Sequence, residues 1–387
     1  MTDIQPTHYH YHPRGAGAAA RERGKRHLFL ALFLPLLGFL LYKSGGYILN
    51  KLNPPEEDLF RKKIVGNPLN DAEWADMTGS LENLAYKYSG HVGIYIKDLN
   101  SDKVWEYNPD RLFPSASLIK VPIMAAICEK IKRSELSLDT QITLTRHDRT
   151  GGSGSLKWAR TGTSLSVMEI IYKMITESDN TATKMLIDYA GISYFQQSFE
   201  NLGLVYTRIY PEGLSLTSGR VARENYTTAR EMSALMERIY KGEMVDRNLS
   251  EFMLDVLKHN KSRSRLRKGL PIGWEIGHKT GLLRKSCHDV GVVFSPRGDY
   301  IIAVLTGDVP DYSSAKGFIS RVAKMTYKYY KIDADYAEFG SEEGALAISE
   351  KALGGSRPDP HSSAEGSNNS ALKSLSGSKS VSRVKYL

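Results

Sequence analysis

Five stretches of the chain are predicted to form β-strands, and in the first of them apolar and polar residues alternate. Two of these stretches come early in the chain and three come late, and a Pro-Arg-Gly-Asp turn separates the last two. The predicted strands are 91–99, 104–108, 274–282, 288–295 and 300–307. Strands are therefore expected near both ends of the folded part of the chain.

Helical spacing of apolar residues occupies the rest of the folded part. One helix is predicted at 71–88, a largely helical middle at about 117–260, and a last helix at 313–330. Strands at both ends with helices between them predict an α+β fold. In this fold early and late segments complete one antiparallel sheet, and the helical middle is inserted on one side of it.

A long apolar run precedes the folded part. Residues 28–42 carry no charge, and extending the run to residue 49 adds only Lys43, whose ammonium can reach a membrane interface. The segment 28–49 is long enough to cross a membrane once as a helix. A cleaved signal peptide is the alternative, but no A-x-A-like site follows the run. Because basic residues precede the run and acidic residues follow it, we expect an uncleaved anchor with the folded body outside the cytoplasm.

Composition assigns the remaining segments. Residues 1–27 are polar and basic, and we expect them to be disordered and cytoplasmic. Residues 50–70 resemble a linker, and the folded body is predicted at 71–336. Residues 337–387 are rich in Ser, Gly, Lys and Asn, so they are expected to form a disordered tail.

The net charge of +9 indicates an anionic partner, which could be nucleic acid, anionic lipid or an acidic polymer such as a cell wall. No nucleic-acid-binding motif is present, so we expect no nucleic-acid binding. Cys128 and Cys287 lack metal-ligand spacing, and two buried, unpaired thiols are expected, with a disulfide as the alternative in an exported protein. The sequence predicts no metal and no cofactor.

The first chemical motif is Ser117-Leu-Ile-Lys120. Residues three apart share a face of a helix, so the hydroxyl and the amine are expected to meet. Pro122 is tolerated only within the first helical turn, which predicts that the helix begins near Ser117. Ser117 would then lie where backbone N–H groups are unsatisfied, a suitable place for an acyl-transfer nucleophile. Taken alone, this motif is weak.

The second motif is Ser178-Asp179-Asn180, at the junction of two predicted helices. The earlier helix begins at the capping box Ser166-x-x-Glu169. Polar side chains at such a junction can project into a cleft. The alternative is that they only cap the second helix, and we weigh this most heavily for Asp179.

The third motif is His278-Lys279-Thr280-Gly281, at the end of a predicted strand. Lys279 offers a cation for a substrate carboxylate, and Thr280 places a hydroxyl beside it. Gly281 allows a substrate backbone to approach the strand edge. An ordinary strand-end turn is the alternative.

The three motifs follow one another in the order SxxK, SDN, KTG, about 60 and 100 residues apart. That order is highly specific, and the chain resembles the class A β-lactamases and the penicillin-binding serine hydrolases. The likeness covers roughly residues 75–330. It implies an αβα sandwich with an all-helical subdomain and an active site between the two.

The resemblance also implies roles for the acylating residues. Ser117 would be the nucleophile, Lys120 its general base, and Ser178 the proton shuttle to the leaving nitrogen. The backbone N–H groups of Ser117 and Leu282 would form the oxyanion hole, where one donor typically contributes about 3 kcal/mol.

The same resemblance implies roles for the substrate-binding residues. Asn180 would bind the substrate amide, Lys279 and Thr280 would hold its carboxylate, and Gly281 would leave room for it.

Deacylation in class A enzymes uses a glutamate on a loop that precedes a Thr-Thr-Pro-like helix start. Here Thr227-Thr228-Ala229 resembles that start, which makes Glu212 the candidate base. The chain departs from the family because Leu216 stands where an asparagine helps hold the water. A surface glutamate is the alternative for Glu212. Glu224 is expected to close the loop by pairing with Arg208 or Arg220.

Three functions remain open from the sequence. The first is a β-lactam hydrolase, with a role in β-lactam breakdown and antibiotic resistance. The second is a D,D-peptidase-like cell-wall enzyme that acts on D-Ala-D-Ala-type peptides and traps β-lactams. The third is a membrane-bound receptor for β-lactams or muropeptides. In each case we expect a monomer tethered to the membrane through 28–49.

Overall fold

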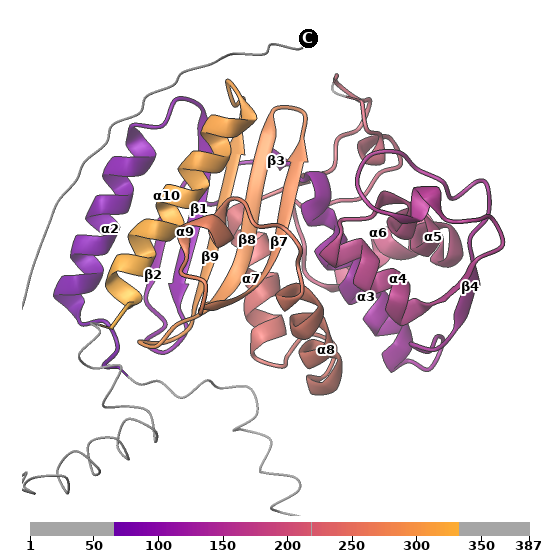
Figure 1. Ribbon diagram of the computed structural model, residues 1–387, viewed down its shortest axis with the longest axis horizontal. Coiled ribbons are helices and arrows are strands. Elements are labelled where there is room, and N and C mark those ends of the chain that lie inside the picture. Colours follow the sequence, from indigo (N-terminus) through magenta and orange to yellow (C-terminus); the bar gives the residue numbers. More distant parts are fainter. Residues whose placement is uncertain (1–65, 218, 333–387) are drawn as a thin grey trace, which may run out of the picture. The chain divides into compact units, whose positions relative to one another are not determined.

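The computed structural model describes residues 66–217 and 219–332 (Figure 1). The predicted anchor, the segment before it and the tail lie outside these residues. Within them, no helix is both long and apolar enough to cross a membrane.

A five-stranded antiparallel sheet has the order β2-β1-β9-β8-β7. Its strands are β1 His91–Asp98, β2 Val104–Tyr107, β7 Glu275–Leu283, β8 Ser286–Phe294 and β9 Tyr300–Gly307. All five strands were predicted. The early strand β1 pairs with the last strand β9 along its full length. Early and late segments therefore complete one sheet, as expected.

Both faces of this sheet are covered, because successive residues of a strand point to opposite faces. On β9, Tyr300, Ile302 and Val304 pack into one hydrophobic cluster with two outer helices, α2 Asp71–Tyr86 and α10 Tyr312–Tyr330. The alternate residues of β9 pack into a second cluster on the other face, with α7 Ala229–Tyr240 and α8 Arg247–Lys258. Figure 1 shows α2 and α10 together over one face. The result is the predicted αβα sandwich.

The all-helical part lies beside the β7 edge of the sheet (Figure 1). It contains α3 Lys120–Lys132, α4 Val167–Thr176, α5 Asn180–Ala190 and α6 Ile192–Asn201. Every residue of α3 from Lys120 to Cys128 is buried, as expected for a helix surrounded by others. Ser166 and Glu169 form the predicted capping box of α4.

Short elements complete the described chain. They are β3 Phe113–Pro114, η1 Ala116–Ile119, β4 Gln141–Thr143, η2 Leu156–Trp158, β5 Ser164–Ser166, η3 Glu212–Leu214, β6 Tyr226–Thr227 and α9 Leu266–Gly269. The predicted helical middle is thus interrupted by loops and by two small sheets. Cys128 and Cys287 are both free and buried, so the prediction of unpaired thiols is confirmed.

Candidate active site

Ser117 lies in the 3₁₀ turn η1, directly before α3, and Pro122 falls in the first turn of α3. The helix thus begins where the proline predicts. Two hydrogen bonds hold the segment that leads into this turn: the Ser115 N–H donates to the Asn225 carbonyl (2.6 Å), and His288 Nε2 lies 2.8 Å from the Pro114 carbonyl. Ser117 is half-buried and lines a cavity.

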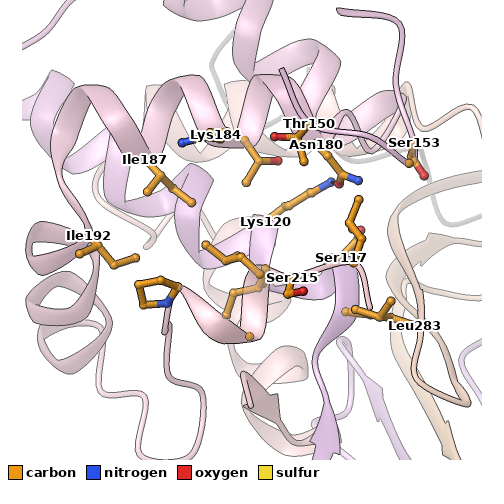
Figure 2. Close-up of a pocket in the computed structure, with 18 of the residues that line it drawn as sticks. Ser117, Lys120, Thr150, Ser153, Asn180, Lys184, Ile187, Ile192, Ser215 and Leu283 are labelled. Carbon is orange, nitrogen blue, oxygen red and sulfur yellow. Dashed lines mark hydrogen bonds between the residues drawn. The ribbon is translucent and has the colours of Figure 1, made fainter. Parts of the chain in front are cut away.

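Lys120 is buried one turn after Ser117 and points towards the second motif (Figure 2). Its Nζ donates to the Ser178 carbonyl (2.6 Å), to Asn180 Oδ1 (2.8 Å) and to Ser178 Oγ (3.3 Å). Burial lowers the pKa of this amine to about 7, against a smaller opposing effect of the Asp179 charge. Near neutral pH about half of the Lys120 amines are therefore free to accept a proton.

In the Ser178-Asp179-Asn180 motif, Asp179 has a structural role, whereas Ser178 faces the lysines of the other two motifs. Asp179 is fully buried and caps α5, since its Oδ1 accepts from the Ala182 N–H (3.0 Å) and its Oδ2 from the Leu156 N–H (2.8 Å). The capping alternative therefore holds for Asp179. Ser178 has a left-handed backbone, with φ of 54°, and its side chain faces the two lysines of the other motifs.

Lys279 on β7 is fully buried and reaches the same serine. Its Nζ donates to Ser178 Oγ (3.0 Å) and to the Thr280 carbonyl (2.9 Å). Burial and then the positive charges of Lys120 and Arg265 hold the pKa of Lys279 well below its usual value. An anionic group placed here would relieve this repulsion, so the region is suited to a carboxylate.

Gly281 and Leu282 follow along β7, beside the nucleophile turn. A Cβ at Gly281 would lie 3.2 Å from the Ser115 carbonyl oxygen and 3.3 Å from the Ala116 Cβ. A larger residue would therefore press on the turn that carries Ser117. Leu282 lines the same cavity as Ser117, which is the placement that an oxyanion hole between their N–H groups requires.

Two further residues shape the site and were not predicted. Arg265 is buried with φ of 60°, and its Nε donates to Cys287 Sγ (3.2 Å). His288 is fully buried, which lowers its pKa to about 4, so this imidazole is neutral. His288 joins β8 to the segment that leads into Ser117. No local motif marks either residue, because their partners are far away in the sequence.

Glu212 is not brought to these groups. Its Oε1 accepts from Arg223 Nη2 (2.9 Å) and Nε (3.2 Å). Its neighbours Pro211, Gly213 and Leu214 line the cavity, but Glu212 is absent from the lining. Its own backbone N–H and then Arg223 lower the pKa of Glu212, which weakens it as a base. Its second oxygen, Oε2, is buried without a hydrogen-bond partner among the described residues, so Glu212 as the water-activating base stays a prediction.

Glu224 does close the loop, but with a different partner from the one predicted. Its carboxylate lies 3.2 Å from Arg284 Nε, and both side chains are at most 10% exposed. Arg284 also donates from Nη2 to the Ser215 carbonyl (2.5 Å), which ties the turn between β7 and β8 to the loop. Arg208 instead pairs with Glu200 at 3.0 Å. The prediction failed because loop sequence alone does not show that a hairpin turn lies across it.

The cavity has a volume of about 790 Å³, which is within the range of small-molecule sites. Ser117, Lys120, Asn180 and Leu282 lie along its wall. Within residues 66–217 and 219–332, no cluster of three potential metal ligands occurs. The arrangement suits acyl transfer through a serine that has an amine as its base.

A family model described as the β-lactamase enzyme family matches residues 76–330. The β-lactamase VEB-1 of Pseudomonas aeruginosa is 26% identical over 277 residues, which cover 67% of this chain and 92% of that protein. A β-lactamase of Streptomyces albus G is 28% identical over 270 residues, covering 65% and 83%.

Solved structures agree with these relatives. An acyl-enzyme complex of a PBP-A point mutant with penicillin-G has a TM-score of 0.60 and 28% identity, covering 66% of this chain and 96% of that one. A β-lactamase from Sphaerobacter thermophilus has a TM-score of 0.60 and 26% identity, covering 67% and 96%. With the family match extending over most of the described residues, this chain belongs to the β-lactamase enzyme family.

Proposed function

We propose that this protein is an active-site-serine enzyme that opens β-lactams and becomes acylated on Ser117. Neutral Lys120 takes the hydroxyl proton as Ser117 attacks the lactam carbonyl. The N–H groups of Ser117 and Leu282 stabilise the oxyanion, and the C–N bond then breaks as the nitrogen receives a proton. Lys279 and Thr280 hold the substrate carboxylate, and Asn180 holds its amide.

The position of Ser178 Oγ carries this proposal. This hydroxyl lies 3.3 Å from Lys120 Nζ and 3.0 Å from Lys279 Nζ, so it contacts both amines. A proton taken by Lys120 can therefore pass through Ser178 to the leaving nitrogen.

We further propose that deacylation is slow, so that β-lactams remain on Ser117. The support is the Glu212–Arg223 ion pair, which occupies one oxygen of the candidate base and lowers its pKa, together with the absence of Glu212 from the cavity lining. The natural acyl donor is then a D-Ala-D-Ala-type peptide, as in a D,D-peptidase. Rapid β-lactam hydrolysis is the second candidate, and the names of the curated relatives favour it.

One experiment separates the two candidates. The full chain is incubated with a chromogenic cephalosporin while product and protein mass are followed. A single persistent adduct, absent from Ser117→Ala, supports slow deacylation. Many turnovers that are abolished by Ser117→Ala and by Glu212→Gln support hydrolysis. Adduct formation or turnover that survives in Ser117→Ala overturns both.

We also propose that residues 28–49 anchor the protein and that its catalytic body lies outside the cytoplasm. The support is the uncharged run at 28–42 and the basic residues before it. Added protease should digest the body in intact cells or in cells stripped of any outer membrane. Protection of the body until the inner membrane is lysed would contradict this topology.

A further inference from the structure

The cavity continues well beyond the reacting groups. Figure 2 shows Ser117 and Leu283 at one end, Lys120 between, and Ile187 and Ile192 at the other end. These residues all line the same cavity of about 790 Å³. Acylation uses only the end at Ser117, so the remaining volume is available to another part of the substrate.

The far part of the cavity has an apolar wall. Ile187 comes from the end of α5 and Ile192 from the start of α6, and Gly191 joins the two helices with a left-handed φ of 83°. Leu214 and Leu216 contribute from the loop on the opposite side. Leu216 is 43% exposed, so apolar surface remains for a ligand to cover.

This apolar wall connects to the catalytic groups. A Cβ at Gly152 would lie 2.7 Å from Asn180 Nδ2 and 3.1 Å from Leu216 Cδ1, so the amide and the leucine are near neighbours. The Lys184–Asp188 ion pair, with Nζ 2.6 Å from Oδ2, also lines the cavity. In Figure 2, Lys184 lies between Asn180 and Ile187, so the cavity passes this ion pair before it reaches the isoleucines.

The position of the carboxylate anchors identifies which half of the substrate enters this part. Lys279 and Thr280 lie on β7, and they hold the leaving-group side of the substrate under the proposed function. Ile187 and Ile192 lie across the cavity, past Lys120 and Asn180 (Figure 2). The side that stays bonded to Ser117 therefore faces the apolar wall.

We infer that the acyl group transferred to Ser117 carries an extended aliphatic arm that lies between Ile187, Ile192 and Leu214. This inference rests on the proposed function and adds the class of acyl donor. An aromatic ring attached directly to the acyl amide would fill the space beside Asn180 but would leave the half-buried Ile192 uncovered. A flexible chain can cover both.

The test is a series of penicillins that share one nucleus and differ in the length of a straight acylamino chain. The series runs from 6-aminopenicillanic acid, which has no chain, to chains of about eight carbons. The second-order rate constant for acylation of the full chain is measured by protein mass. Each methylene that enters the cavity should raise this constant about two- to fourfold. A constant that stays level or falls as the chain lengthens would overturn the inference.

Two variants test which residues of the cavity contact the acyl chain. Ile192→Asn and, on the loop, Leu216→Asn should each lower the ratio of long-chain to short-chain rate constants by about threefold or more. Ile272→Asn is the matched control, since Ile272 is 95% exposed and is not part of this cavity. An equal ratio in both variants and in the control would place the arm elsewhere.

Failure of the inference can be told apart from failure of the proposed function. If 6-aminopenicillanic acid and all its derivatives leave the mass of the protein unchanged, acylation of Ser117 itself is wrong. If they acylate Ser117 without any dependence on chain length, only the aliphatic arm is wrong.

Discussion

Acidification should slow acylation through a single group, Lys120. Burial lowers the pKa of this amine to about 7, and the neutral form is the one that can accept the Ser117 proton. A group with this pKa is about one tenth neutral at pH 6 and about one hundredth neutral at pH 5. Since kcat/KM for acylation reports the free enzyme, it should fall about tenfold per pH unit below pH 6 as Lys120 becomes protonated. At high pH it should fall again, because Lys279, whose pKa is also lowered, loses the charge that binds the substrate carboxylate.

The assay is stopped-flow acylation by a chromogenic cephalosporin between about pH 5 and pH 10. Asp179→Asn removes the charge that raises the Lys120 pKa, and its amide oxygen can still accept from the Ala182 N–H. The midpoint of the profile should therefore move to lower pH in this variant. Its NH₂ group then faces the Leu156 N–H, so the thermal unfolding of this variant is compared with the wild type. A rate constant that keeps rising through pH 9 would mean that Lys120 titrates near its ordinary pKa. A flat profile down to pH 5 would show that Lys120 is not the base.

Three other changes have defined outcomes. The folded-state pKa of Lys120 is below its unfolded value, so between about pH 7 and 10 the unfolded chain binds more protons, and the free energy of unfolding should rise with pH. Chemical denaturation should show this slope in the wild type and a shallower slope in Lys120→Met, where the lowered pKa of Lys279 still contributes. Arg284→Met leaves the buried Glu224 carboxylate without its cationic partner, which should lower local stability by about 3 kcal/mol. Hydrogen exchange in the loop 209–226 should then become faster, and unchanged exchange would show that the pair does not hold the loop. Gly281→Val should lower the acylation rate at least about tenfold, because its side chain presses on the Ser115 carbonyl and the turn beside it; a wild-type rate would mean that the turn can move.

The sequence predicted those elements whose formation depends on residues close together in the chain, such as strands and helix starts. The apolar run at 300–307, which follows a Pro-Arg-Gly-Asp turn, predicted a strand, and the structure places its odd and even residues in different hydrophobic clusters. Pro122 located the start of the catalytic helix because proline cannot occupy a helix interior. The three short motifs could be brought together only through their resemblance to a known family.

The errors arose where a side chain's direction depends on distant parts of the chain. The carboxylate of Glu224 binds a residue 60 positions away, and His288 reaches Pro114 across 174 positions. Contacts between residues so far apart in the sequence cannot be predicted from the spacing of neighbouring residues.

The pairing of β1 with β9 has a consequence for biosynthesis. His91 pairs with Gly307, so the central part of the sheet cannot form until nearly the whole body has left the ribosome. Until β9 has been synthesised, β1 can pair only with β2. The apolar residues of β1 that pack in the folded protein then remain exposed to solvent. Closing so large a loop is slow, and the waiting strand is prone to pair with other chains. We therefore expect the newly made protein to depend on chaperones more than a protein whose neighbouring strands are adjacent in sequence.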